Sequence, residues 1–167
     1  QEKGNVHQHL DLIAGLPYED YERFAQSFRD VYALHPEQLQ LGFLKVLKGS
    51  YMHEKTEDYQ LLYQDRPPFE VLSTKWLSYD DVIRLKGVEE MVEVYYNSGQ
   101  FVNTLRLLEE EFTDTFALYE NLSRYYEENG LHMINHSRIT RYEVLFAFIK
   151  ACVEKNVENY RQMLILD

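Results

Sequence analysis

The residues best suited to hold a ligand lie in the first predicted strand, over residues 9–15. Side chains alternate across a strand, so Asp11, Ile13 and Gly15 share one face and aliphatic residues share the other. Glycine has no Cβ to keep a neighbour away. A face with a carboxylate, an isoleucine and a bare backbone therefore suits a cleft in which a ligand approaches closely.

Residues 9–50 are predicted to form one βαβ unit around this strand. A proline ends the strand, and apolar residues at helical spacing predict a helix over residues 21–35. The second strand, residues 39–47, alternates like the first and places Gln40 and Gly42 opposite its aliphatic face. Because a crossover helix of this kind joins parallel strands, the two strands are expected to run parallel.

The remaining chain changes from strands to helices. Residues 59–76 hold two short aromatic and β-branched runs around an Asp-Arg-Pro-Pro break, which predicts a loose hairpin. After Trp76 the apolar spacing is helical, with a capping box predicted at Ser78 and stop signals at Gly99 and Gly130. Four or five helices are predicted: residues 78–97, 101–112, 113–129, 137–153 and 157–166.

Composition and charge narrow the class of protein. Of the 167 residues, 45% are hydrophobic and 14% aromatic, which indicates a packed globular protein. The net charge of -11 repels phosphate backbones, so no nucleic-acid partner is expected. With no signal peptide and no apolar run approaching about 18 residues, we expect a cytoplasmic protein without membrane contact. Cys152, the single cysteine, is predicted to be a small buried hydrophobe in a helix.

Metal ligation is considered at two histidine pairs and one acidic run. His7 and His9 lie near the start of the chain, and His132 and His136 have i, i+4 spacing across an interruption between two helices. Solvated histidines are the preferred interpretation of both pairs. The acidic run 109–111 is read as the solvated face of a helix, because its spacing does not resemble a Ca²⁺-binding loop. No metal site is predicted.

Aromatic and basic residues of the helical region offer weaker candidates. Two aromatic pairs could line a substrate pocket, although their helical spacing favours core packing: Tyr95 with Tyr96, and Tyr125 with Tyr126. Three basic residues could reach an anionic group, although such residues usually remain solvated: Arg84, Lys86 and Arg106. No catalytic residue is predicted.

Two parts of the sequence carry a family resemblance. Asp11 to Glu19 reads DLIAGLPYE, and with the second strand and Gly49-Ser50 it resembles the last two βα units of radical S-adenosylmethionine (SAM) enzymes, which read close to D-x-I-x-G-x-P-G-E and then a strand ending in G-T. Downstream, PPFEVL, WLSYDDVIRLKGVEEM and YYNSGQF are similar to the C-terminal domain of unknown function in one subgroup of these enzymes. That subgroup carries a cobalamin-binding domain ahead of its radical core.

The resemblance implies a fold class of α/β fragment plus α: one βαβ unit of a truncated parallel barrel, a short hairpin, and a bundle of four or five helices. Residues 1–50 would be the truncated end of a radical SAM barrel and residues 51–167 a mainly helical domain of unknown function. In the family, the residues matching Ile13 and Gly15 lie against the adenine of SAM. Tyr18 stands where the family usually has glycine.

The resemblance also implies what this chain lacks. The family binds a [4Fe-4S] cluster through a Cys-x3-Cys-x2-Cys loop, which one cysteine cannot supply. We therefore expect a C-terminal piece that is inactive alone and holds no cofactor of its own. SAM, the cluster and, in this subgroup, cobalamin would belong to the full-length parent, and the partner would be the missing N-terminal part of the same polypeptide.

Two functions follow as hypotheses. In the first, the chain supplies the last barrel strands and a substrate-shaping or capping helical domain of an iron-sulfur oxidoreductase or transferase. In the second, the helical region is a protein-interaction or dimerisation module without catalysis, since it is rich in aromatic and acidic residues. A homodimer could also form through the exposed strands of a truncated barrel.

Overall fold

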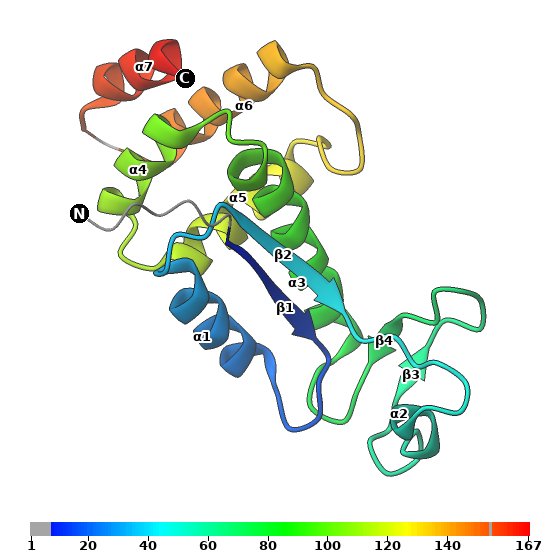
Figure 1. The fold of residues 1–167 in the computed structure, drawn as a ribbon. Coiled ribbons are helices and arrows are strands. Elements are labelled where there is room, and N and C mark those ends of the chain that lie inside the picture. The colour runs from blue at the N-terminus through cyan, green and yellow to red at the C-terminus, as the bar shows by residue number, and fades with distance from the viewer. Residues whose placement is uncertain (1–7, 154) are drawn as a thin grey trace. The chain divides into compact units, whose positions relative to one another are not determined.

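The computed structural model describes residues 8–153 and 155–167 and divides into two compact units (Figure 1). Unit 1 ends at Glu89, and unit 2 runs from Glu90 to Asp167. Unit 1 contains both small sheets, and unit 2 is helical. The structure therefore has the expected mixed α/β character, with the strands confined to the first half of the chain.

Unit 1 opens with the predicted βαβ unit. Strands β1 (His9–Ala14) and β2 (Gln38–Phe43) pair in parallel, and helix α1 (Tyr21–Tyr32) connects them. Leu39, Leu41 and Phe43 are buried on one face of β2, and the apolar stripe of α1 is buried too. The parallel pairing expected from the sequence is confirmed.

β2 ends earlier than the predicted strand 39–47, because the chain turns to a new partner. Leu44 N–H still donates to Ala14 C=O at 2.9 Å, but Lys45 forms an antiparallel bridge with Glu70. Val46 N–H then donates to Phe69 C=O at 2.9 Å. A segment from later in the chain thus pairs with the residues that follow β2, next to the end of β1.

The predicted hairpin is confirmed as a short antiparallel pair, β3 (Leu62–Tyr63) and β4 (Val71–Ser73). Before it lies a one-turn helix, α2 (Tyr51–Glu54), which is not among the predicted helices. Ser50 explains the turn, because its Oγ accepts a hydrogen bond from His53 N–H at 3.3 Å and caps the helix.

Helix α3 (Tyr79–Met91) follows and continues as a short π-helix, η1 (Val92–Asn97). The capping box expected at its start is present: Ser78 Oγ accepts from Asp81 N–H at 3.1 Å, and Asp81 Oδ2 accepts from Ser78 N–H at 3.2 Å. Within unit 1, the Lys86 ammonium of α3 lies 4.2 Å from the centroid of the Phe43 ring of β2. Figure 1 shows α1 and α3 beside the two strands.

Unit 2 contains the remaining predicted helices: α4 (Val102–Glu111), α5 (Thr115–Glu128), α6 (Arg138–Cys152) and α7 (Val157–Leu166). Asp114 and Ser137 cap α5 and α6 with side-chain oxygens. α4 lacks a cap from its own flanking residue. Instead the Asp167 carboxylate accepts from Asn103 N–H at 2.8 Å and from Thr104 N–H at 2.9 Å, which fixes the end of the chain against α4.

Two expectations for side chains in unit 2 have different outcomes. Tyr95 and Tyr126 are buried, so the preference for core packing is confirmed at these positions. Cys152 is exposed, and the prediction that it is buried was wrong. It is the last residue of α6, where the chain turns away, and the next residue, Val153, enters the core instead.

Candidate functional site

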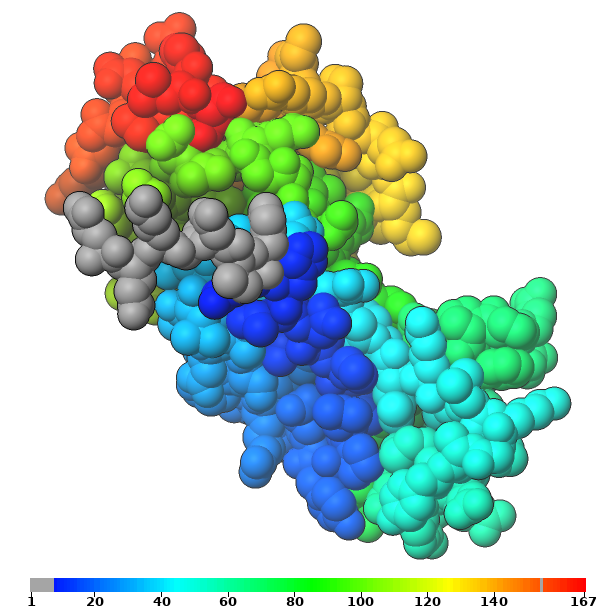
Figure 2. Space-filling view, in the orientation of Figure 1, coloured from blue at the N-terminus to red at the C-terminus, as the bar shows by residue number. Residues whose placement is uncertain are grey.

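A groove runs along the open face of the parallel sheet. Ile13 on β1 lies opposite Gly42 on β2, and Asp11 lies opposite Gln40, and all four line a groove of about 390 Å³. Figure 2 shows the blue residues of β1 and the cyan residues of β2 at the surface. The structure thus brings together the polar-face residues that strand alternation had placed on one side.

The groove has an apolar floor and a polar rim. Ile13, which is 46% exposed, and Leu16 form the apolar floor of the groove. Asp11, Gln40 and Lys45 provide the polar groups of its rim. A Cβ built on Gly42 would meet only Leu12 C=O, at 3.8 Å. The missing side chain therefore leaves room opposite Ile13, and the groove can accept a flat apolar group with polar substituents.

Gly15 is not among the residues that line this groove. It adopts φ +91°, and a Cβ built on it would lie 2.9 Å from Val71 Cγ1 and 3.5 Å from Leu44 Cβ. Its bare backbone therefore allows the β1–α1 turn to pack against β4. The family role of Gly15 beside adenine stays a prediction, and in this structure its close neighbour is Val71.

The turn after Gly15 carries a cluster of aromatic rings. Tyr18 lies with its ring centroid 4.7 Å from that of Trp76 and 6.1 Å from that of Tyr59, and the Tyr59 and Trp76 centroids are 5.4 Å apart. The cluster was missed in the sequence, because its members come from segments far apart along the chain. The only signal was the tyrosine at a family glycine position.

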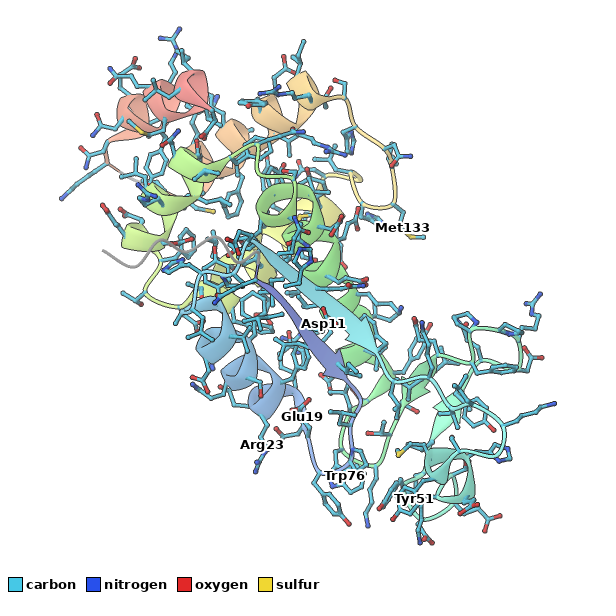
Figure 3. The ribbon with its side chains drawn as sticks, in the orientation of Figure 1. Asp11, Glu19, Arg23, Tyr51, Trp76 and Met133 are labelled. Carbon is cyan, nitrogen blue, oxygen red and sulfur yellow. The ribbon has the colours of Figure 1, made fainter. Side chains whose placement is uncertain are left out.

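Glu19 follows Tyr18 and begins the approach to α1, close to Arg23 (Figure 3). Burial raises the pKa of the Glu19 carboxyl, although the Arg23 guanidinium acts in the opposite direction. In the folded chain this carboxyl therefore keeps its proton to a higher pH than its ordinary value of 4.5. Its charged form is disfavoured by folding, so its contribution to stability falls as the pH rises above that value.

We expect Glu19→Gln to raise the free energy of unfolding at neutral pH by a few tenths of a kcal/mol, a small effect because the site is partly solvated. The gain should shrink near pH 4, where the native carboxyl is protonated. Urea unfolding at both pH values measures it. Glu22→Gln is the control, because Glu22 accepts a hydrogen bond from Arg29 at 2.8 Å and its loss should not stabilise. A Glu19→Gln gain that is larger at low pH would contradict the burial argument.

The edge of β1 away from β2 is a second open feature of the sheet. Gln38 N–H donates to Gln8 C=O, and Leu44 N–H donates to Ala14 C=O. Backbone groups alternate in direction along a strand, so the peptide groups of Asp11 and Ile13 point to the opposite edge. Within the described residues the sheet has only these two strands. A further strand could therefore pair with β1.

Some classes of site are absent from the part of the chain that the structure describes. No three His, Cys, Asp or Glu side chains gather there as they would around a metal ion. His136 Nε2 lies 2.8 Å from Leu131 C=O, so one ring nitrogen of the pair considered with His132 already has a hydrogen-bond partner. The pair of His7 and His9 includes a residue outside the described ones. No helix among residues 8–153 and 155–167 has the length and apolar character to cross a bilayer.

The fold and the groove together define a mixed α/β chain whose parallel strand pair is covered on one face and open on the other. Residues 57–167 match the family described as a protein of unknown function, DUF4080, and this chain belongs to that family. The match agrees with the resemblance to a domain of unknown function, and it begins after the βαβ unit. No curated protein matches this chain.

Proposed function

We propose that this chain is the C-terminal part of a radical SAM iron-sulfur oxidoreductase or transferase of the cytoplasm. Residues 1–50 would supply the last strands of its barrel, and residues 51–167 a helical domain that shapes or caps the substrate site. The observation that carries the proposal is the parallel β1–β2 pair with one covered face and one open face. The motif resemblance at Asp11 to Glu19 supports the same assignment.

Barrel architecture accounts for both open features of the sheet. In a parallel barrel, helices cover the outside of each strand, and the inner side chains meet other strands or a ligand. The α1 side of the β1–β2 pair would be the outer face, and the Asp11 and Ile13 side the inner one. The outer edge of β1 at Asp11 and Ile13, which pairs with no other strand among the described residues, would then receive the preceding barrel strand.

The residues of this chain fit one of the implied cofactors and not the other. Ile13 offers an aliphatic contact to a flat ring, and Gly42 leaves room beside it, so the groove suits the adenine of SAM. Cys152 is the only cysteine and cannot provide the three thiolates that a [4Fe-4S] cluster needs. Cluster ligands, and any cobalamin site, would therefore have to come from the N-terminal part of the parent.

The test is SAM affinity in the complete polypeptide after anaerobic reconstitution of the cluster. Ile13→Arg should weaken SAM binding by about tenfold or more, because burial of an isoleucine contributes roughly 1.5–3 kcal/mol and the arginine fills the groove. Ile139→Arg is the matched control, since Ile139 is also exposed but lies on α6. Equal SAM affinity in the wild type and the Ile13 variant would remove the groove from the cofactor site.

An interaction module is the second candidate, and one observation favours it. Unit 2 exposes large apolar side chains at the start of α6, at the end of α7 and in the loop before α6: Met133, Ile134, Ile139, Ile165 and Leu166. Sedimentation of the chain separates the two routes to a homodimer. Loss of a dimer in Ile139→Lys would support the helical module, whereas loss in Ile13→Lys would place the contact on the exposed strands.

A further inference from the structure

Four aromatic side chains gather at the carboxyl end of β1: Tyr18, Tyr51, Tyr59 and Trp76, called the aromatic cluster below. Tyr51 joins the other three through its hydroxyl, which lies 3.4 Å from the Tyr59 hydroxyl. Figure 3 shows Tyr51 and Trp76 at the same end of unit 1. In sheets of parallel strands, ligands bind at the carboxyl ends. The cluster is thus in the region where such folds place their sites.

Backbone contacts hold the aromatic cluster in place. Thr74 Oγ1 accepts hydrogen bonds from Trp76 N–H at 3.1 Å and Leu77 N–H at 3.0 Å, which fixes the turn that carries the indole. Lys75 N–H donates to Tyr59 C=O at 2.9 Å and joins that turn to the segment after α2. Gly15 then lets the β1–α1 turn approach Val71, so Tyr18 reaches the indole.

The cluster exposes more ring surface than core packing explains. Tyr18 is 67% exposed and Tyr51 is 61% exposed, whereas the large aromatic residues of the core are almost fully buried. Tyr18 also holds φ +66°, a conformation that is strained for a bulky side chain. A glycine there would avoid the strain, so the exposed ring is kept at a cost to stability.

The ring spacing decides what kind of ligand could bind. A cage around a cation needs space between its rings. The ring centroid of Trp76 lies only 4.7 Å from that of Tyr18 and 5.4 Å from that of Tyr59, so these rings are in contact. A ligand must therefore lie on the outer faces of the rings. The hydrogen bond with Tyr51 and burial raise the pKa of the Tyr59 hydroxyl above its ordinary value of 10. The ring faces are electron-rich, and the Lys75 ammonium lies 6.0 Å from the centroid of the Trp76 ring.

We propose that the aromatic cluster is a stacking platform for a planar aromatic or heteroaromatic ring of a small-molecule ligand. The outer ring faces offer the offset-stacked and edge-to-face contacts that such rings prefer. Leu16 lines the groove on the open face of the sheet and is two residues before Tyr18 in the sequence. A ligand on the platform would therefore lie beside that groove. The inference does not depend on radical SAM activity.

The test uses the single tryptophan as its own reporter. Trp76 is the only tryptophan, so a ¹⁵N-labelled chain gives one indole N–H signal. Benzamide should shift this signal in a saturable way. Cyclohexanecarboxamide, which has the same substituent on a saturated and more hydrophobic ring, should bind roughly threefold to tenfold more weakly, because only the planar ring gains stacking energy. Equal or tighter binding of the saturated ring would overturn the proposal, as would the lack of a saturable shift with benzamide.

Variants then assign the binding to the cluster. Tyr18→Gly removes one ring and relieves the strained φ, so the chain should stay folded and bind benzamide about fivefold or more weakly. Tyr51→Leu lies outside the strained turn and should also weaken binding. Tyr79→Ala, which removes an exposed tyrosine on α3, should leave the affinity unchanged. Unchanged affinity in both cluster variants, with the other amide signals still dispersed, would overturn the assignment. The assay contains neither SAM nor a cluster, so its failure would leave the proposed function untouched.

Discussion

Gly15→Ala should lower the free energy of unfolding of unit 1 by roughly 2–4 kcal/mol. Two costs combine at this position: alanine is strained at φ +91°, and its Cβ would lie 2.9 Å from Val71 Cγ1. Relief of the contact would move the β1–α1 turn away from β4 and carry Tyr18 away from Trp76. Urea unfolding followed by the fluorescence of Trp76 measures the loss, because this residue lies in unit 1.

Alanine variants of two other glycines separate the cost of backbone strain from the cost of the close contact with Val71. Gly49 has φ +79° with nothing within 4 Å of a built Cβ, so Gly49→Ala should show the strain alone, about 1 kcal/mol. Gly42 lies in β2 with only Leu12 C=O nearby, and its alanine variant should change stability little. If Gly15→Ala costs no more than Gly49→Ala, the close approach to Val71 does not hold the turn.

Tyr95→Ala should destabilise unit 2 by about 3–5 kcal/mol. The Tyr95 ring is fully buried, with its centroid 4.9 Å from that of Phe101, so its removal opens a cavity. Its hydroxyl lies 2.6 Å from the Tyr126 hydroxyl and also donates to Arg141 C=O at 3.3 Å. The variant therefore also leaves a buried Tyr126 hydroxyl without this partner. Far-UV circular dichroism during urea unfolding reports the loss.

Phenylalanine variants isolate the hydroxyl pair from the ring. Tyr95→Phe should cost about 1–2 kcal/mol, and the double variant with Tyr126→Phe should cost less than the sum of the two single variants, because no buried hydroxyl is then left unpaired. Additive costs would show that the 2.6 Å contact contributes nothing to stability. Tyr96→Ala, at the half-buried neighbouring position, should cost clearly less than Tyr95→Ala.

Most of the fold could be predicted from the periodicity of apolar residues along the chain. Alternation in β1 and β2 was enough to place Asp11, Ile13, Gln40 and Gly42 on one open face, because the side-chain period of a strand is fixed. The helices of unit 2 follow from apolar spacing with stop signals such as Gly130. The capping box at Ser78 depends on residues three apart and was equally visible.

Features that depend on distant segments could not be predicted. Gly15 was read as a gap for a ligand, but the neighbour that requires it to be glycine is Val71, in a strand from a different part of unit 1. The carboxylate that caps α4 comes from Asp167, at the other end of unit 2. Cys152 shows a different limit, since apolar neighbours in the sequence do not reveal that a helix ends and turns its last side chain outward.

Formation of 5′-deoxyadenosine by the polypeptide encoded by the complete reading frame tests the radical SAM assignment. We expect a three-cysteine loop upstream of residue 1, and release of 5′-deoxyadenosine when the reconstituted protein is reduced with SAM present. Replacing those cysteines should abolish this release. A reading frame that begins at or near Gln1, or a complete protein that binds no iron-sulfur cluster and leaves SAM intact, would refute the assignment.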